Sequence, residues 1–166
     1  MNTTRILLTL ALLGGLAACE SEPMDTGVDA NSIDTVLNEH AADRDQVISS
    51  LADARDIELT TSIALDRAAA RHALDLADRR MSTHIGRDGS SPRERLSDAG
   101  MESDGVREFI FQIQGEPENL AERALATWLA PFEDNAVLNE PATHAAVAFA
   151  PTDDGGYVGV LLLAQR

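Results

Sequence analysis

The hydrophobic residues of the first half of the chain recur every three or four positions, which is the period of an amphipathic helix. This spacing predicts helix over residues 33–55, as one helix or two joined helices, and again over residues 61–80. The segment Ser91-Pro92-Arg93-Glu94 has the pattern of a capping box with proline at the first helical position. It predicts a short helix over residues 92–99 that Gly100 ends.

The second half of the chain has the pattern of strands. Residues 106–114 alternate, so that Phe109 and Phe111 share one face and Glu108 and Ile110 share the other. A helix is predicted over residues 117–130, and two apolar strands over 144–150 and 157–164 form a hairpin. The continuous apolar run 160–163 is typical of a central strand covered on both faces. Helices packed on an antiparallel sheet make this an α+β domain.

Net charge and cysteine content exclude one class of binding partner and one kind of covalent cross-link. The chain has 28 acidic and 13 basic residues, a formal net charge of −15, and all its basic residues are arginines. Such a surface repels a polyanion, so nucleic acid is excluded as a partner. Cys19 is the only cysteine, which excludes an internal disulfide.

The N-terminal segment has the pattern of a secretory leader. Arg5 precedes an apolar run that ends in Leu16-Ala17-Ala18-Cys19, and this tetrad resembles the bacterial lipobox. The sequence therefore predicts a lipoprotein signal peptide over residues 1–18, an acidic tether over 19–31 and a folded domain over 32–166. Acylated Cys19 would then hold the protein on the lipid bilayer. Glu20 in place of aspartate favours the outer membrane, facing the periplasm; the alternative is an ordinary signal peptide.

Spaced landmarks across residues 48–164 resemble the CAP superfamily, in the bacterial branch of the SCP/PR-1-like group. The most specific run is His84-x-Gly86-x-Asp88-Gly89, followed by Arg95 and Gly100. Upstream landmarks arrive in the same order, and they are Leu51, Arg55, Leu65, Ala68, Ala69, His72 and Ala73. The resemblance implies a three-layer α-β-α sandwich with a mainly antiparallel sheet, which agrees with the order of elements predicted above.

The resemblance also implies a central cleft, which in this family carries two histidines and two acidic residues and binds divalent metals such as zinc. His84 matches the first histidine, Glu108 matches the glutamate of a Glu-Asn motif, and Trp128 matches the tryptophan before the second histidine. Pro131 and Asp134 then stand where a serine or glutamate and the second histidine belong. The cleft tetrad is therefore expected to be degenerate.

The number of available ligands decides between a metal site and a structural histidine. His84 and Glu108 give two ligands, and Glu133 or Asp134 would add an oxygen, whereas a zinc site needs three or four good donors. The favoured hypothesis is that His84 orders its loop through a hydrogen bond to Glu108, with no cofactor; the lesser alternative is a divalent ion such as zinc at His84. His72 lies on an apolar helix stripe and is interpreted as a core histidine.

These observations predict a function in the bacterial envelope. The favoured hypothesis is an anchored, non-catalytic module that binds a small or cell-wall ligand, since the family is linked to lipids, sterols and cell-wall material. The alternative is a metal-assisted periplasmic hydrolase that uses His84 and Glu108, with a carboxylate from Glu133 or Asp134.

Overall fold

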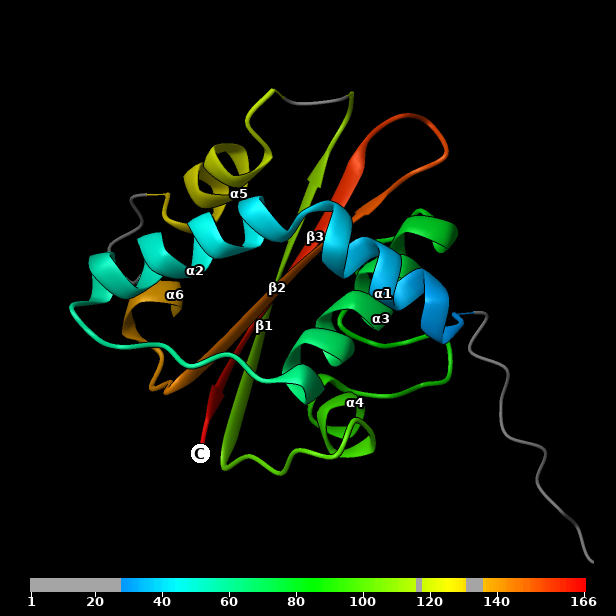
Figure 1. Ribbon diagram of the computed structural model, residues 1–166. Helices are drawn as coiled ribbons and strands as arrows, with labels where there is room; N and C mark the ends of the chain where they lie inside the picture. The colour runs from blue at the N-terminus through cyan, green and yellow to red at the C-terminus, as the bar shows by residue number, and fades with distance from the viewer. Residues whose placement is uncertain (1–27, 116–117, 131–135) are drawn as a thin grey trace, which may run out of the picture.

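The fold is built on a three-stranded antiparallel sheet. The computed structural model describes residues 28–115, 118–130 and 136–166. Its strands are β1 (Gly105–Ile113), β2 (His144–Pro151) and β3 (Tyr157–Gln165), and their order in the sheet is β1-β3-β2. Figure 1 shows the three strands crossing the middle of the molecule between two groups of helices. The sheet and its helices confirm an α+β fold.

β3 is the central strand, as its continuous apolar run predicted. It pairs antiparallel with both neighbours, with Leu161 opposite Phe109 of β1 and Val147 of β2. Residues 158–164 of β3 are all buried, because helices cover both faces of the sheet. β1 therefore lies at one edge of the sheet and β2 at the other.

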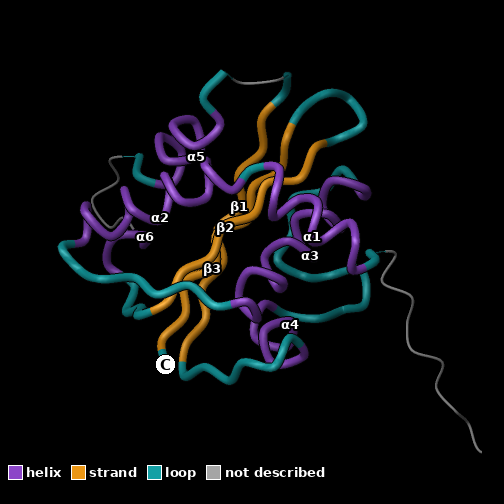
Figure 2. Tube along the Cα trace, in the orientation of Figure 1, coloured by secondary structure: helices purple, strands orange, loops and turns teal. Residues whose placement is uncertain are grey.

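Six helices lie on the two faces of the sheet in the described part of the chain (Figures 1 and 2). One apolar core joins the sheet to α1 (Ala30–Glu39), α3 (Ile63–Arg79) and α4 (Pro92–Asp98). A second core joins the opposite face to α2 (Ala41–Arg55), α5 (Leu120–Trp128) and α6 (Ala136–Asn139). The result is the expected three-layer α-β-α arrangement.

The alternation along β1 places its side chains on two faces as predicted, and the structure adds that each face packs in a separate core. Phe109 and Phe111 point to the core with α2 and α5, whereas Ile110 packs in the core with α3 and α4. Glu108 shares the face of Ile110, so its carboxylate points towards α3 and α4 instead of towards water. This single acidic residue on an inward-facing position is the basis of the candidate site.

Local capping chemistry fixes the helix ends close to their predicted positions. Ser62 accepts a hydrogen bond from the Leu65 N–H and begins α3, and Ser91 and Glu94 form the predicted capping box of α4. Gly100 follows α4 with φ of 91°, a left-handed conformation that glycine adopts without a steric cost.

Of the two forms predicted for residues 33–55, the structure has two joined helices, α1 and α2, which meet at His40. Some bounds differ from the prediction: α5 is shorter than the predicted residues 117–130, and the short α6 was not predicted. α1 begins at Ala30, inside the segment expected to be tether, because the Asp29 carboxylate accepts the Ser32 N–H and supplies an N-cap. The sequence did not reveal this N-cap, because residues 19–31 contain several acidic residues and an aspartate suits both a tether and a helix start.

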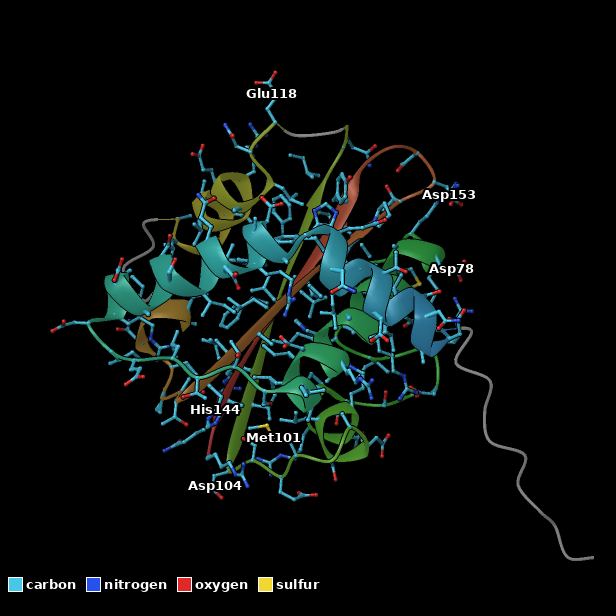
Figure 3. All side chains as sticks on the ribbon, viewed as in Figure 1. Asp78, Met101, Asp104, Glu118, His144 and Asp153 are labelled. Carbon is cyan, nitrogen blue, oxygen red and sulfur yellow. The ribbon has the colours of Figure 1, made fainter. Side chains whose placement is uncertain are left out.

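The acidic side chains that give the chain its charge lie mostly at the periphery. Figure 3 shows Asp78, Asp104, Glu118 and Asp153 at the outer rim of the molecule, pointing away from the sheet. In the described part of the chain no helix combines the length and apolar character needed to cross a bilayer.

Candidate functional site

The candidate site is centred on Glu108, whose carboxylate has partners from three other segments. Its Oε2 accepts a hydrogen bond from Arg95 Nη2 of α4 at 2.6 Å. Its Oε1 lies 3.0 Å from His84 Nδ1, in the loop between α3 and α4, and 3.4 Å from His72 Nε2 of α3. The side chains of Glu108, Arg95 and His72 are at most 2% exposed, whereas that of His84 is 60% exposed. The hydrogen bond predicted between His84 and Glu108 is therefore present.

The partners of Glu108 hold it ionised although it is buried. Burial by itself raises the pKa of the Glu108 carboxyl, because it removes water from the charged form. The hydrogen bond and charge of His72, the charge of Arg95 and the hydrogen bond of His84 act in the opposite direction and leave that pKa below its usual value. Glu108 is thus a buried anion held by a buried cation.

Arg95 is a site residue whose role the sequence did not reveal. The sequence placed Arg95 in the CAP-like landmark, but its spacing gave no partner. In the structure its guanidinium also donates to the Ser90 carbonyl at 2.7 Å and contacts the His84 carbonyl at 3.3 Å. Arg95 therefore connects the Glu108 carboxylate to the backbone of the loop that carries His84.

His72 is buried, as expected for a core histidine, but it also belongs to the site. Its Nε2 lies 2.9 Å from the Thr83 carbonyl and 3.4 Å from Glu108 Oε1, and because both are acceptors this nitrogen carries the proton. The feature of the sequence that could have indicated this role is the position of His72 on the apolar stripe of α3, which faces the sheet on the same side as Glu108. That signal could not identify the partner, because the register between α3 and β1 is a tertiary property.

The loop that carries His84 is tied to α3 by ion pairs. The Asp75 carboxylate receives Arg79 of its own helix and the backbone N–H and Nε of Arg87. Arg71 Nη2 donates to Asp88 at 2.8 Å. Burial raises the pKa of Asp88, but its hydrogen bonds from Ser90 and the charge of Arg71 outweigh burial and lower it. These pairs fix the loop between residues 84 and 90.

Gly86 gives a test of how closely this loop is packed. A Cβ atom at Gly86 would lie 2.7 Å from both Asp88 Oδ1 and Ser90 Oγ, which is too close for any contact. We therefore expect Gly86→Ala to displace the loop, to cost about 1–3 kcal/mol in the free energy of unfolding and to broaden the NMR signals of His84. Gly89→Ala is the control for a loop glycine with open space around it, although its φ of 83° adds strain. An unchanged His84 signal in Gly86→Ala would contradict tight packing of the loop.

An open cleft of about 400 Å³ lies beside the Glu108 cluster. This volume is within the range of small-molecule sites. One wall is polar and consists of Ser82, Thr83 and His84. The other wall is formed by α5 and α6, and its residues are Thr127, Trp128, Ala136 and Val137. Residues 108–110 of β1 lie between the walls, so the cleft follows the edge of the sheet.

Of the four cleft residues predicted from the sequence, the structure shows two in contact. His84 and Glu108 are in contact at the cleft, whereas Glu133 and Asp134 lie outside the described residues. Among residues 28–115, 118–130 and 136–166, no group of three or more histidine, cysteine, aspartate or glutamate side chains is arranged to hold a metal ion. Arg95 pairs with Oε2 of Glu108, and His84 contacts the other oxygen, Oε1.

Comparison with known proteins gives structural relatives. No family model and no curated protein sequence matches the chain. An outer surface protein from Borrelia burgdorferi is similar in structure, with a TM-score of 0.64 and 22% identity, over 76% of this chain and 95% of that one. An extracellular protein containing an SCP domain, from Bacillus anthracis, has a TM-score of 0.63 and 18% identity, over 80% of this chain and 43% of that one. Together with the α-β-α layers and the cleft beside His84 and Glu108, these similarities show that the chain has the CAP/SCP-like fold.

Proposed function

We propose that the protein is a non-catalytic binding module of the bacterial cell envelope, which holds a lipid or cell-wall ligand in the cleft along β1. The observation that carries this proposal is that both oxygens of Glu108 have internal partners. Oε2 receives Arg95, and Oε1 receives His84 and lies near His72. A carboxylate whose two oxygens are already engaged by Arg95, His84 and His72 serves to position His84 and is a poor proton acceptor for a substrate.

The same geometry disfavours the hydrolase alternative. The Arg95 guanidinium already neutralises the buried Glu108 carboxylate, so a second cation on this carboxylate would meet like-charge repulsion without a net negative charge to offset it. A metal-activated water also needs three protein ligands, of which the described residues supply His84 and Glu108 at the cleft. Exposed His84 is then a hydrogen-bonding group at the mouth of the cleft.

The envelope location is supported by two independent observations. The N-terminal segment has the pattern of a secretory leader, with a lipobox-like tetrad that ends at Cys19, which lies outside the described residues. The two similar structures named above are an outer surface protein and an extracellular protein. We propose that acylation of Cys19 holds the module on the outer membrane, facing the periplasm.

Replacement of Cys19 tests the anchor directly. We expect Cys19→Ser to move the protein from the membrane fraction to the soluble periplasmic fraction, because the acyl chains supply the apolar area that holds it on the bilayer. Fractionation followed by mass spectrometry of the N-terminal peptide measures both location and acyl mass, and Ser21→Ala is the matched control outside the tetrad. Retention of the Cys19→Ser protein in the membrane fraction would refute the anchor.

The single tryptophan provides the test of binding. Trp128 lines the cleft and is the only tryptophan of the chain, so a change in intrinsic fluorescence reports on this site alone. Protein purified from cells that express the full chain is titrated with palmitic acid and, separately, with soluble peptidoglycan fragments. We expect a saturable change with one of the two probes and none in Thr127→Arg, which fills the cleft. A flat signal with both probes would contradict a lipid or cell-wall ligand in this cleft.

A zinc titration of the same protein separates the module from the hydrolase. We expect no specific heat on addition of zinc chloride, because Arg95 neutralises the carboxylate that would bind it. His84→Ala controls for binding elsewhere on this acidic surface. Heat that appears with the native protein and disappears in His84→Ala would favour the metal-assisted hydrolase.

A further inference from the structure

The floor of the cleft is the β1 edge of the sheet, as the described residues form it. Glu108, Phe109 and Ile110 are consecutive residues of β1, and all three line the cleft. Consecutive side chains of a strand point to opposite faces, so a groove that touches all three follows the edge of the strand and does not lie on one face. β1 is an edge strand that pairs only with β3 in the described sheet.

The backbone along this edge has unused hydrogen-bonding groups. In an antiparallel pair every second residue of an edge strand directs its N–H and C=O away from the neighbour. Between residues 106 and 112, the described part of the chain provides no hydrogen bond to these backbone groups from outside the sheet. Gln112 contacts the Met81 carbonyl through its side chain, which leaves its backbone free of that contact. The cleft thus presents a row of alternating donors and acceptors.

The two walls differ in chemistry, and they stand on opposite faces of β1. Glu108 and Ile110 point to the face on which His84 lies, beside Ser82 and Thr83. Phe109 points to the other face and packs in the core that contains Trp128 and Val137. A chain laid along β1 would direct alternate side chains to a polar wall and to an apolar wall, which is the arrangement that recognises a peptide by strand addition.

We propose that the ligand of this cleft is an extended polypeptide segment that pairs with β1 as a fourth strand. This inference rests on the proposed function in that it uses the same cleft of a binding module, but it assigns that cleft a polypeptide in place of a lipid or cell-wall ligand. Main-chain hydrogen bonds to the free edge supply affinity, and apolar side chains at every second position contact Phe109 and Val137. The net charge of −15 favours a neutral or basic segment over an acidic one.

The probes are capped seven-residue peptides in which alanine, valine, leucine or phenylalanine alternates with threonine or arginine. Each peptide is made in three forms. One is unmodified, one is N-methylated at the odd-numbered amides, and one is N-methylated at the even-numbered amides. A paired strand uses one edge, so one methylated form loses its hydrogen bonds with β1 and the other retains them. By calorimetry with the full-chain protein we expect at least tenfold weaker binding for one methylated form only.

Two further measurements locate the peptide. Amide hydrogen exchange by NMR is expected to show added protection at alternate residues of 106–112. Thr127→Arg is expected to weaken binding at least tenfold, because Thr127 lines the cleft, whereas Ala126→Arg is the matched control on the adjacent exposed position of α5. Circular dichroism confirms that both variants are folded.

Three results would overturn the inference. Equal binding of both methylated forms would mean that the peptides adhere through charge and not through β1. Equal loss in Thr127→Arg and Ala126→Arg would place binding outside the cleft. Absence of binding by every peptide, with a saturable Trp128 response to palmitic acid or peptidoglycan fragments, would assign the cleft another occupant and leave the proposed function intact. Absence of both responses would refute both proposals.

Discussion

Arg95→Met is expected to reduce the free energy of unfolding by about 3–5 kcal/mol, the largest effect of any single substitution considered for this protein. The substitution leaves the Glu108 carboxylate buried, at 1% side-chain exposure, without its cationic partner at 2.6 Å. It also removes the donors to the Ser90 and His84 carbonyls, so the loop that carries His84 loses a support. Urea unfolding followed by circular dichroism measures the change.

A double-mutant cycle separates the ion pair from simple loss of packing. Arg95→Met combined with Glu108→Leu removes both charges, and His72 Nε2 retains the Thr83 carbonyl as a partner. We expect the double variant to be more stable than Arg95→Met alone, with an interaction free energy of about 0.5–3 kcal/mol. Arg93→Met, an exposed arginine of the same helix, is the matched control. Additive losses in the double variant would mean that Glu108 and Arg95 are not energetically coupled.

Acid is expected to destabilise the fold through the same carboxylate. The folded-state pKa of Glu108 lies below its ordinary value of 4.5, since His72, Arg95 and His84 together outweigh the effect of burial. The stability that Glu108 contributes is therefore complete above about pH 4.5 and is lost as the pH falls through the lowered folded-state value. Below that value Arg95 is a buried cation without an anion. Unfolding free energies measured between pH 7 and pH 3 test this dependence.

Other carboxyls with lowered pKa values act in the same direction, so the comparison must be made between variants. Asp88 is one of them, held by Ser90 and Arg71 in spite of burial. The double variant Arg95→Met with Glu108→Leu retains Asp88 and lacks the buried pair. We expect its stability to fall less steeply with acid than that of the native protein. If the unfolding free energies of the two proteins fall in parallel between pH 7 and pH 3, Glu108 does not contribute to the loss of stability in acid.

Local elements were predictable because their causes are local in the sequence. The capping box of Ser91 and Glu94 involves residues three positions apart, and the structure contains it as predicted. The alternation in β1 predicted which side chains share a face, and the apolar run in β3 predicted a central strand. The exact position of the break at His40 was not predicted. The start of α1 after Asp29 was not predicted either, because an aspartate that caps a helix cannot be distinguished by sequence from the acidic residues around it.

The candidate site was only half predictable from the same sequence. The pairing of His84 with Glu108 followed from the resemblance to a family, and the structure has these two side chains in contact. Arg95 and His72 were visible as residues but not as partners of Glu108, because α3, α4 and β1 meet only when the helices pack on the sheet. The two remaining candidates, Glu133 and Asp134, lie outside the described residues.

By itself the sequence determined the main helices and strands other than α6, the face of β1 that Glu108 shares with Ile110, and the acidic composition, since periodicity, capping and charge are properties of short segments. Only the tertiary structure decided what surrounds the Glu108 carboxylate and that the cleft follows β1 at the edge of the described sheet. The physical reason is distance along the chain: residues 72, 84, 95 and 108 come together through packing of separate elements on one sheet, and no local pattern encodes which of their charges face each other.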